Sequence, residues 1–388
     1  MNRQTLIIPK QIVTINAEME ILRNHGVQIE NGIINGICDI ANFDYDNYPG
    51  NIYVFNNLTM LPGFIQTHVH LCQSMFRGLA DDMHLLDWLQ KRIFPYENSH
   101  NRNSLRLSAQ LGINELLESG TTTILDMGTM NYQELVFEEM ISSGIRGLSG
   151  KCMLDENDLF PSFKETTEQS LSTTTELANS FHGAEDGRIK YGFAPRFALS
   201  CSEKLLKETV ELMKDYDGSL YHTHSSENLG EIAAIKRKYG KENIEFFDSI
   251  NALSDRTVLA HCIHTNEKEI ELLKVTETRV AHCPSSNLKL GSGIADIPNY
   301  LDKGISVSLG ADGAPCNNNL SMFTEMRLAA LIQKTKHGPT AMHAETMVKM
   351  ATIEGAKALH LENHVGSIEV GKKADLILLD LEKPTNSL

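Results

Sequence analysis

The chain has 388 residues, with 35 Lys and Arg against 50 Asp and Glu, which gives a formal charge of −15. This acidity argues against a nucleic-acid partner or an anionic membrane, because phosphate groups are bound by clustered Lys and Arg. No apolar run approaches the roughly 18 residues of a membrane span, and the seven cysteines are scattered, without a C-x-x-C pair. We therefore expect a cytoplasmic chain with no membrane segment and no disulfide framework.

The first 58 residues and the end of the chain are rich in β-type runs. Gly, Asn and Asp clusters separate the early runs, and no helical periodicity lies between them. Similar runs return at Ile368–Val370 and Ala374–Asp380. The pattern predicts a small antiparallel β unit that the end of the chain completes, over residues 1–58 and 362–388. Its early runs are Thr5–Ile8, Gln11–Ile15, Gly26–Ile29 and Ile52–Phe55.

Between residues 59 and 361, short apolar runs alternate with long amphipathic stretches. Eight such runs are the number that a (β/α)8 barrel requires, so the sequence predicts an α/β fold with one TIM-like barrel over 59–361. The expected strands are Met60–Ile65, Thr122–Met127, Ile145–Leu148, Ile189–Ala194, Ser219–His224, Thr257–His261, Arg279–His282 and Ile305–Leu309. The expected helices include Ser104–Ser119, Glu203–Lys214, Asn228–Tyr239 and Glu267–Lys274.

Histidines stand at corresponding places in these runs. His68 and His70 form an H-x-H pair after the first run, and alternate residues of a strand point the same way, so both imidazoles can bind one ion. Three later runs end at a histidine, and the eighth and last run of the barrel is followed by Asp312. A lone histidine is usually a core residue, but the C-terminal ends of barrel strands meet at one mouth. The repeated placement therefore favours a metal site. The strand-end histidines are His224, His261 and His282.

The fifth run leaves an alternative open. Its end reads Y-H-T-H, so His222 and His224 form a second H-x-H pair. His224 is the better candidate ligand, because Glu227 follows it by three residues at the start of the next loop.

Several segments resemble one enzyme family when they are taken in chain order. They read LPGFIQTHVH, HTHSSEN, LAHCIHTNE, AHCPSSNLKLGSG and SLGADGAPCNNNLSMFTEMRLAAL, and EVGKKADLILLD stands near the end of the chain. The first five resemble the amidohydrolase superfamily, in particular its branch of aminopurine deaminases and triazine hydrolases. The last is similar to the C-terminal β-sandwich signature of that superfamily, and this resemblance implies that the β unit built from both termini is a small β-sandwich domain.

The resemblance implies one metal ion per chain. His68, His70, His224 and Asp312 would bind a single divalent ion, usually zinc, although Fe, Mn or Ni also accept nitrogen and oxygen ligands. The fourth run ends in Phe193–Arg196, without the modified Lys of dinuclear relatives. We therefore expect no second metal.

Catalytic roles also follow from the resemblance. A water activated by the metal would attack the carbon that carries the amino group. Asp312 would accept a proton from that water, His261 would orient it, and Glu227 would carry a proton to a ring nitrogen and then to departing ammonia. The alternative for Glu227 is a solvated helix cap, since S-S-E-N also fits that role. Other catalytic motifs, such as G-x-S-x-G and H-E-x-x-H, are absent.

The substrate pocket carries two conflicting signals. By resemblance to deaminases of 5′-deoxyadenosine, methylthioadenosine and S-adenosylhomocysteine, Trp88 would cover the base, and Glu97 would accept from the ribose hydroxyls. Asn317 also fits this branch. Arg196 and Gln73 instead resemble guanine deaminases and can read a purine carbonyl. We favour a 6-aminopurine nucleoside, with guanine, another aminopurine or pterin, or a triazine as alternatives.

The remaining expectations concern partners. The substrate would be a small purine-type molecule, and barrels of this branch often form homodimers. A barrel that served only as a non-catalytic scaffold would lose unneeded buried ligands, whereas this chain keeps all four candidate ligands and Glu227. The sequence therefore favours an aminohydrolase.

Overall fold

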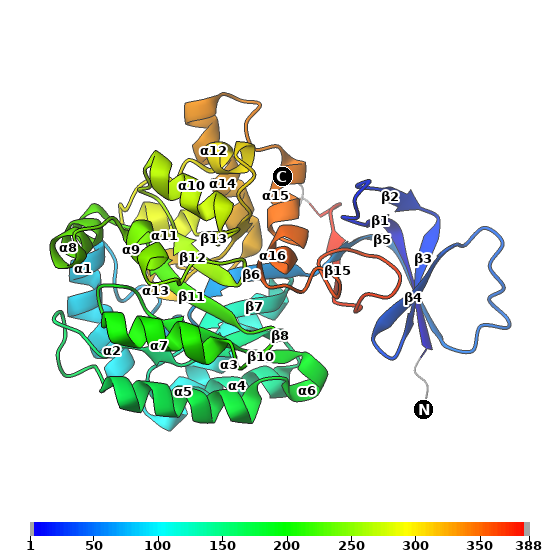
Figure 1. Cartoon of the computed structure of the whole chain (residues 1–388). Helices are drawn as coiled ribbons and strands as arrows, with labels where there is room; N and C mark the ends of the chain where they lie inside the picture. The colour runs from blue at the N-terminus through cyan, green and yellow to red at the C-terminus, as the bar shows by residue number, and fades with distance from the viewer. Residues whose placement is uncertain (1–3, 384–388) are drawn as a thin grey trace.

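The computed structural model describes residues 4–383 and contains a barrel beside a smaller sheet (Figure 1). Strand β15, from the end of the chain, lies between the barrel and the rest of the small sheet. Residues 384–388 of the predicted β domain lie outside the described residues. Among the helices of residues 4–383, none combines the length and the apolar character that crossing a membrane requires.

Strands from both ends of the chain build the small sheet. Their order is β15-β5-β1-β3-β4, with β2 paired to β1. β1 is parallel to β5, whereas β15 is antiparallel to β5 and β3 is antiparallel to β1. The predicted β domain from both termini is thus confirmed. Within residues 4–383 its strands form one mixed sheet, because β1 and β5 are parallel where an antiparallel arrangement was expected. The strands are β1 (Gln4–Val13), β2 (Ile21–Arg23), β3 (His25–Glu30), β4 (Ile33–Asp39), β5 (Asn51–Pro62) and β15 (Leu376–Asp380).

Three expected β runs differ from the structure. The two earliest runs form the single strand β1, whose pairing with β5 shifts register between Pro9 and Gln11. Pro9 has no N–H to donate, and a register shift is where a strand tolerates proline. Ile368–Val370 is not a strand. Ile368 is nevertheless buried in the core of the sheet, and its backbone N–H donates to Thr14 O at 2.7 Å.

Parallel strands form the barrel wall in the order β6-β7-β8-β10-β11-β12-β13-β14, with β9 beside β10. A parallel bridge between Val69 and Asp312 joins the first and last strands. The predicted (β/α)8 barrel is therefore confirmed. The strands are β6 (Phe64–Val69), β7 (Thr121–Met127), β8 (Arg146–Gly150), β9 (Cys152–Met153), β10 (Ile189–Pro195), β11 (Leu220–Ser225), β12 (Thr257–His261), β13 (Arg279–His282) and β14 (Val307–Leu309).

The first barrel strand begins later than expected. The apolar run Met60–Ile65 is divided between β5, which ends at Pro62, and β6, which begins at Phe64. Gly63 separates them, and its N–H donates to Asp375 O rather than to the barrel. The run therefore serves two sheets, and β5 crosses the expected domain boundary at residue 58.

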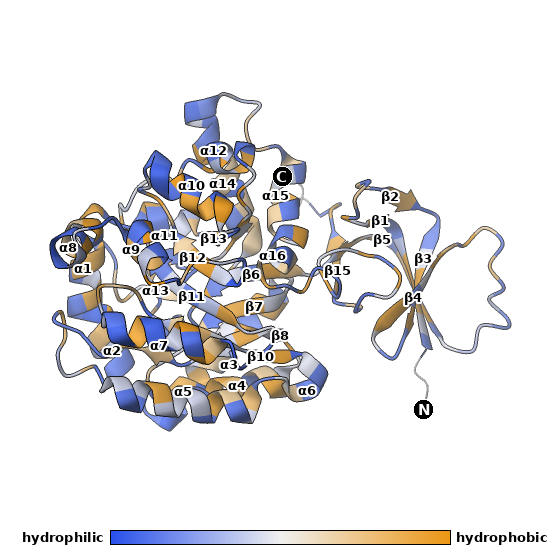
Figure 2. Ribbon diagram, in the orientation of Figure 1, coloured by the Kyte–Doolittle hydropathy of each residue, from blue (hydrophilic) through white to orange (hydrophobic). Residues whose placement is uncertain are grey.

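Helices surround the barrel, and Figure 2 shows hydrophilic residues along the outer ones such as α7. Capping boxes at Asn101, Thr166, Asn228 and Asn266 fix the starts of α3, α5, α8 and α10, because each side chain satisfies otherwise unpaired N–H groups. The four expected helices are confirmed to within two residues at each end. The α-helices that follow barrel strands and cover the wall are α3 (Arg102–Glu118), α4 (Gln133–Ser143), α5 (Thr167–Phe181), α7 (Glu203–Met213), α8 (Leu229–Tyr239), α9 (Asn243–Ser249), α10 (Glu267–Val275), α12 (Ile297–Asp302), α14 (Met322–His337), α15 (Ala344–Met350) and α16 (Ile353–Ala358).

Shorter segments occupy the loops at the mouth of the barrel. A 3-10 helix follows β6 directly, and a π-helix joins α1 to α2. The loops that follow the first, seventh and eighth strands contact one another at the mouth. The segments are the 3-10 helix Leu71–Phe76, α1 (Leu85–Trp88), the π-helix Leu89–Ile93, α2 (Phe94–Asn98), α11 (Pro284–Lys289) and α13 (Ala314–Asn317), with α6 (Ala184–Gly187) elsewhere, before β10.

Candidate metal and active site

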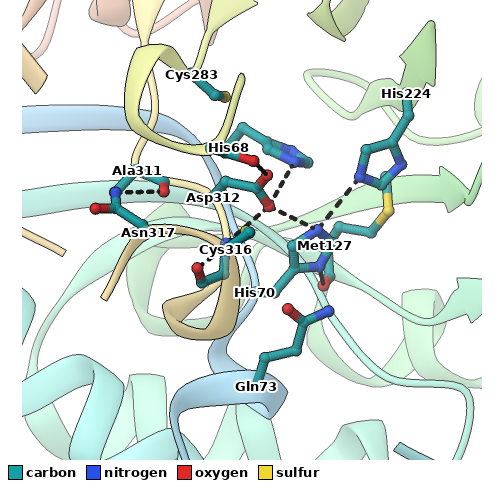
Figure 3. A network of polar contacts seen from close by, with 12 residues as sticks. His68, His70, Gln73, Met127, His224, Cys283, Ala311, Asp312, Cys316 and Asn317 are labelled. Atoms are coloured by element: carbon teal, nitrogen blue, oxygen red, sulfur yellow. Dashed lines mark hydrogen bonds and ion pairs between the residues drawn. The ribbon is translucent and has the colours of Figure 1, made fainter. Parts of the chain in front are cut away.

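Three imidazoles and one carboxylate meet at the mouth of the barrel (Figure 3). One ligand atom from each of His68, His70, His224 and Asp312 lies within 4.8 Å of the others. His68 Nε2 is 3.4 Å and His70 Nε2 is 3.3 Å from Asp312 Oδ1, and His70 Nε2 is 3.3 Å from His224 Nε2. All four side chains are buried. The structure thus brings together the ligand set that the sequence predicts.

The strands explain why these residues meet. His68 is in β6 and His70 follows directly, His224 is in β11, and Asp312 follows β14. Asp312 has a φ of 63°. A non-glycine residue in this left-handed region is uncommon and costs free energy, and such residues cluster at functional sites. The turn at Asp312 directs its carboxylate back over the barrel. The backbone N–H of Asp312 donates to the backbone carbonyl of His68 at 3.0 Å.

Each ligand histidine uses its other ring nitrogen for a hydrogen bond. Nδ1 lies 2.8 Å from Met127 O in His70 and 2.7 Å from Arg196 O in His224. Because a carbonyl only accepts, Nδ1 carries the proton in both rings, and each Nε2 keeps a free lone pair. His68 Nδ1 lies 2.8 Å from His222 Nε2.

The group fits a divalent cation. Burial lowers the pKa of His70 to about 3, and the nearby His68 contributes to the shift. The imidazole of His70 is therefore neutral, as a metal ligand must be. His68 Nε2 is buried and has no hydrogen-bond partner among the residues that the structure describes. Neutral imidazole nitrogens with one carboxylate are a common donor set for zinc and similar ions.

Glu227 and His261 lie beside the ligand group. His261 Nε2 is 3.6 Å from Glu227 Oε2 and 3.9 Å from Asp312 Oδ2. Burial raises the pKa of Glu227 to about 7. Burial alone would lower the pKa of His261, but Glu227 and Asp312 raise it above its ordinary value. A carboxyl group that titrates near neutral pH in a buried site is typical of a proton-transfer residue.

The loop after β13 supports this arrangement. Ser286 Oγ donates to Asp312 Oδ2 at 2.7 Å, and Asn287 Oδ1 is 2.8 Å from His261 Nδ1. Although burial alone would raise the pKa of Asp312, the adjacent imidazole of His68, together with those of His70 and His261, holds it well below its usual range. The sequence reasoning did not identify Ser286 or Asn287. Both lie in the segment AHCPSSNLKLGSG, and the resemblance of that segment to the amidohydrolase superfamily is the signal that could have suggested them.

A narrow cavity opens beside the metal-ligand group. Three of the five expected pocket residues line it. Gln73, Trp88 and Arg196 line it, whereas Glu97 and Asn317 do not. The cavity is lined by His70, Gln73, Trp88, Leu89, Arg196, Phe197, His224, Glu227, Leu290 and Asp312.

The two expected pocket residues outside the lining are engaged elsewhere. Both carboxylate oxygens of Glu97 accept hydrogen bonds from Arg196, and Gln73 Nε2 donates to Glu97 Oε1 at 2.7 Å. Asn317 Nδ2 donates to Ala311 O at 2.7 Å and to Glu325 at 2.9 Å. Asn317 therefore contacts the backbone that precedes Asp312 rather than the cavity.

The chain is similar to known proteins over almost its whole length. The Amidohydrolase family model matches residues 59–388. A 5-methylthioadenosine/S-adenosylhomocysteine deaminase of Thermoanaerobacter pseudethanolicus is 36% identical over 374 residues, 96% of this chain and 84% of that protein. A 5′-deoxyadenosine deaminase of Methanothermobacter thermautotrophicus is 36% identical over 364 residues, 94% of this chain and 82% of that protein.

A solved structure gives the same picture. An adenosine deaminase from Xanthomonas campestris with bound zinc superposes with a TM-score of 0.92 at 28% identity, covering 99% of this chain and 86% of that one. The match of the family model and the identity to both deaminases agree with the sequence resemblance and with the geometry of the site. The chain belongs to the amidohydrolase family.

Proposed function

We propose that this protein is a metal-dependent hydrolytic deaminase of 6-aminopurine nucleosides. Water adds to the carbon that carries the exocyclic amine, the C–N bond breaks, and the products are the 6-oxo nucleoside and ammonia. The observation that carries the proposal is the placement of Glu227, with its pKa near 7, in the same cavity as the converging ligands His70, His224 and Asp312. Similarity to curated purine-nucleoside deaminases supports the same reaction.

The metal is proposed to be one zinc ion per chain, held by His68, His70, His224 and Asp312. A divalent ion in this position acts as a Lewis acid and lowers the pKa of a water molecule to about 7. Zinc is favoured because the Xanthomonas campestris adenosine deaminase contains it. Iron, manganese and nickel remain alternatives, since the same nitrogen and oxygen donors accept them.

Three residues of this chain would transfer protons or orient the attacking water. Glu227 lies in the cavity with a pKa raised to about 7, so its protonated form would give one proton to a ring nitrogen. It would then take up a proton released by the added water and pass that second proton to the leaving ammonia. His261 faces Glu227 and Asp312 through Nε2, while Asn287 accepts from its Nδ1–H, so His261 would orient the attacking water. Asp312, whose lowered pKa keeps it ionised before the reaction, would accept a proton of that water.

The substrate is proposed to be a 5′-modified adenosine, of the 5′-deoxyadenosine, methylthioadenosine or S-adenosylhomocysteine type. The names of the curated relatives support this class. Trp88 lines the cavity and would cover the base. Its indole Nε1 is buried without a hydrogen-bond partner among the described residues, so it is available to an acceptor on the substrate.

One contact favours a second candidate, a guanine-type or other oxo-purine substrate. Arg196 and Gln73 line the cavity and both hold Glu97, so Glu97 could accept ribose hydroxyls only if this ion pair opened. Gln73 Oε1 is buried and has no hydrogen-bond partner among the described residues. A free amide oxygen beside a guanidinium matches the donor and carbonyl edge of an oxo-purine.

Ammonia release from zinc-loaded protein tests the proposal. The panel contains 5′-deoxyadenosine, methylthioadenosine, S-adenosylhomocysteine, adenosine, guanine and a chlorotriazine. We expect turnover of the nucleosides, and turnover of guanine alone would favour the second candidate. The R196H variant provides the matched comparison, because its preference among purines should shift if Arg196 reads the base. Zinc-loaded protein that releases no ammonia from any of these compounds would contradict the proposed activity.

A further inference from the structure

The H-T-H segment of β11 carries two histidines that face the barrel interior. His224 belongs to the metal-ligand group, but His222 does not. His222 is fully buried, and its Nε2 lies 2.8 Å from Nδ1 of the ligand His68. The two rings meet edge to face, with centroids 4.9 Å apart and an interplanar angle of 86°. The two histidines of the segment thus have different tasks.

The hydrogen bond between the two rings has one direction when a metal is bound. His68 must keep the lone pair of Nε2 for the ion, so its proton sits on Nδ1 and is donated to His222 Nε2. His222 then carries its own proton on Nδ1, which is buried and has no hydrogen-bond partner among residues 4–383. Leaving that buried donor unpaired costs free energy. The hydrogen bond from His68 thus leaves Nδ1 of His222 without a partner among the described residues.

His68 differs from the other two histidine ligands in this respect. His70 and His224 donate Nδ1–H to the backbone carbonyls of Met127 and Arg196. A carbonyl can only accept, so the backbone alone fixes the tautomer of those two rings. The tautomer of His68 is set by a side chain, which a single substitution can change.

We propose that His222 is a positioning residue that holds His68 in the Nδ1–H tautomer and in the orientation that binds the metal. Partners of this kind fix ring orientation and raise ligand basicity. The inference rests on the metal site of the proposed function. It assigns the second H-x-H pair of the sequence one ligand and one support.

The chain offers closely matched variants for a test. In H222Q the side-chain amide reaches the position of Nε2, so an acceptor for His68 is kept. In H222N the amide reaches only the position of Nδ1, so His68 loses its partner while the site stays polar. His282 provides the control, because it is equally buried at a strand end and neither of its nitrogens has a hydrogen-bond partner among the described residues.

The measurement is the dissociation constant for Zn²⁺ alone, by competition with a chromophoric chelator, on folded protein verified by circular dichroism. We expect zinc binding by H222N to weaken about 10–100-fold, whereas H222Q and H282N stay close to the wild type. The visible absorption spectrum of Co²⁺-loaded H222N should also change, because the spectrum reports the orientation of the ligands.

Several results would overturn the inference. They are wild-type zinc affinity in H222N, an equal loss in H282N, or a loss in H222Q as large as in H222N. If H222N does not fold, H222Q alone still decides against the inference: it keeps the acceptor for His68, so weakened zinc binding in folded H222Q would overturn it. Failure of the proposed activity looks different, since it would leave zinc binding intact and abolish ammonia release. A wild-type protein that bound no divalent ion would overturn both.

Discussion

Glu97 and Arg196 form a buried ion pair directly beside the metal-ligand group. Arg196 Nη1 lies 2.6 Å from Glu97 Oε2, and Nη2 lies 3.2 Å from Glu97 Oε1. The backbone carbonyl of Arg196 accepts the Nδ1–H of His224 at 2.7 Å. One residue thus lines the cavity, neutralises a buried carboxylate and orients a metal ligand, so the pocket and the metal site are mechanically linked.

The first prediction concerns the stability of this pair. Both side chains are almost fully buried, at 2% exposure for Arg196 and 0% for Glu97. E97Q leaves the Arg196 cation without a counter-charge, and removal of one partner from a buried pair costs about 3–5 kcal/mol. We expect the free energy of unfolding in urea to fall by an amount of this order.

An exposed pair provides the control for E97Q. Lys204 and Glu168 lie 2.7 Å apart with exposures of 54% and 72%. Such surface pairs contribute only about 0–1 kcal/mol, so E168Q should unfold like the wild type. If E97Q were as stable as E168Q, the buried pair would not hold the loops of the mouth together.

The second prediction concerns metal binding by the ligand group. A ligand that binds only the folded state stabilises it by about 2.7 kcal/mol at 100 times its dissociation constant. Zinc should therefore raise the unfolding midpoint of the wild type but not of H68A or D312A, and ammonia release should fall to background in both. H364A, which removes an exposed histidine, should respond to zinc like the wild type. A full zinc response in H68A would remove that residue from the ligand set.

The third prediction separates positioning of His261 from metal binding. Asn287 Oδ1 accepts from His261 Nδ1–H, which leaves Nε2 facing Glu227 and Asp312. N287L removes the acceptor, so kcat should fall about 10–100-fold, as for lost supporting contacts, while KM and zinc content stay near the wild-type values. N287D keeps an acceptor oxygen and should recover most of the loss. An equal loss in N287D and N287L would indicate a packing role instead.

Much of this architecture could be predicted from the sequence, and particular residues explain where prediction ended. The barrel and its ligands follow from local patterns, because His68, His224 and Asp312 stand at strand ends that the fold must bring together. The first strand was placed too early, since Pro62 and Gly63 divide one apolar run between two sheets. Such a division depends on strand pairing and leaves no periodic signal.

Contacts between distant side chains were harder to predict. Glu97 and Arg196 are 99 residues apart, and His68 and His222 are 154 residues apart. The sequence around each of these residues gives no indication of which distant residue it will contact. The expected homodimer and the cytoplasmic location stay predictions, because they concern surfaces and surroundings rather than the barrel.

The last prediction uses the titration of Glu227 in metal-free protein, since a bound cation would itself lower the pKa of the carboxyl group. Burial raises this pKa from 4.5 to about 7. Because the folded state holds the proton more tightly than the unfolded state, Glu227 contributes its full stability below pH 4.5. That stability is lost as the pH rises through 7. E227Q stays neutral at every pH and escapes this loss.

E227Q should therefore unfold like the wild type near pH 5 and be more stable at pH 8. At about 1.4 kcal/mol for each unit of pKa, the gain is up to about 3 kcal/mol. Urea unfolding at several pH values measures it. The same variant should bind zinc normally yet lose turnover about 10²–10⁴-fold, the usual contribution of a proton-transfer group. A stability difference that did not change with pH would mean that Glu227 is ionised and solvated in the folded protein, and it would then lack the proton that the proposed reaction requires.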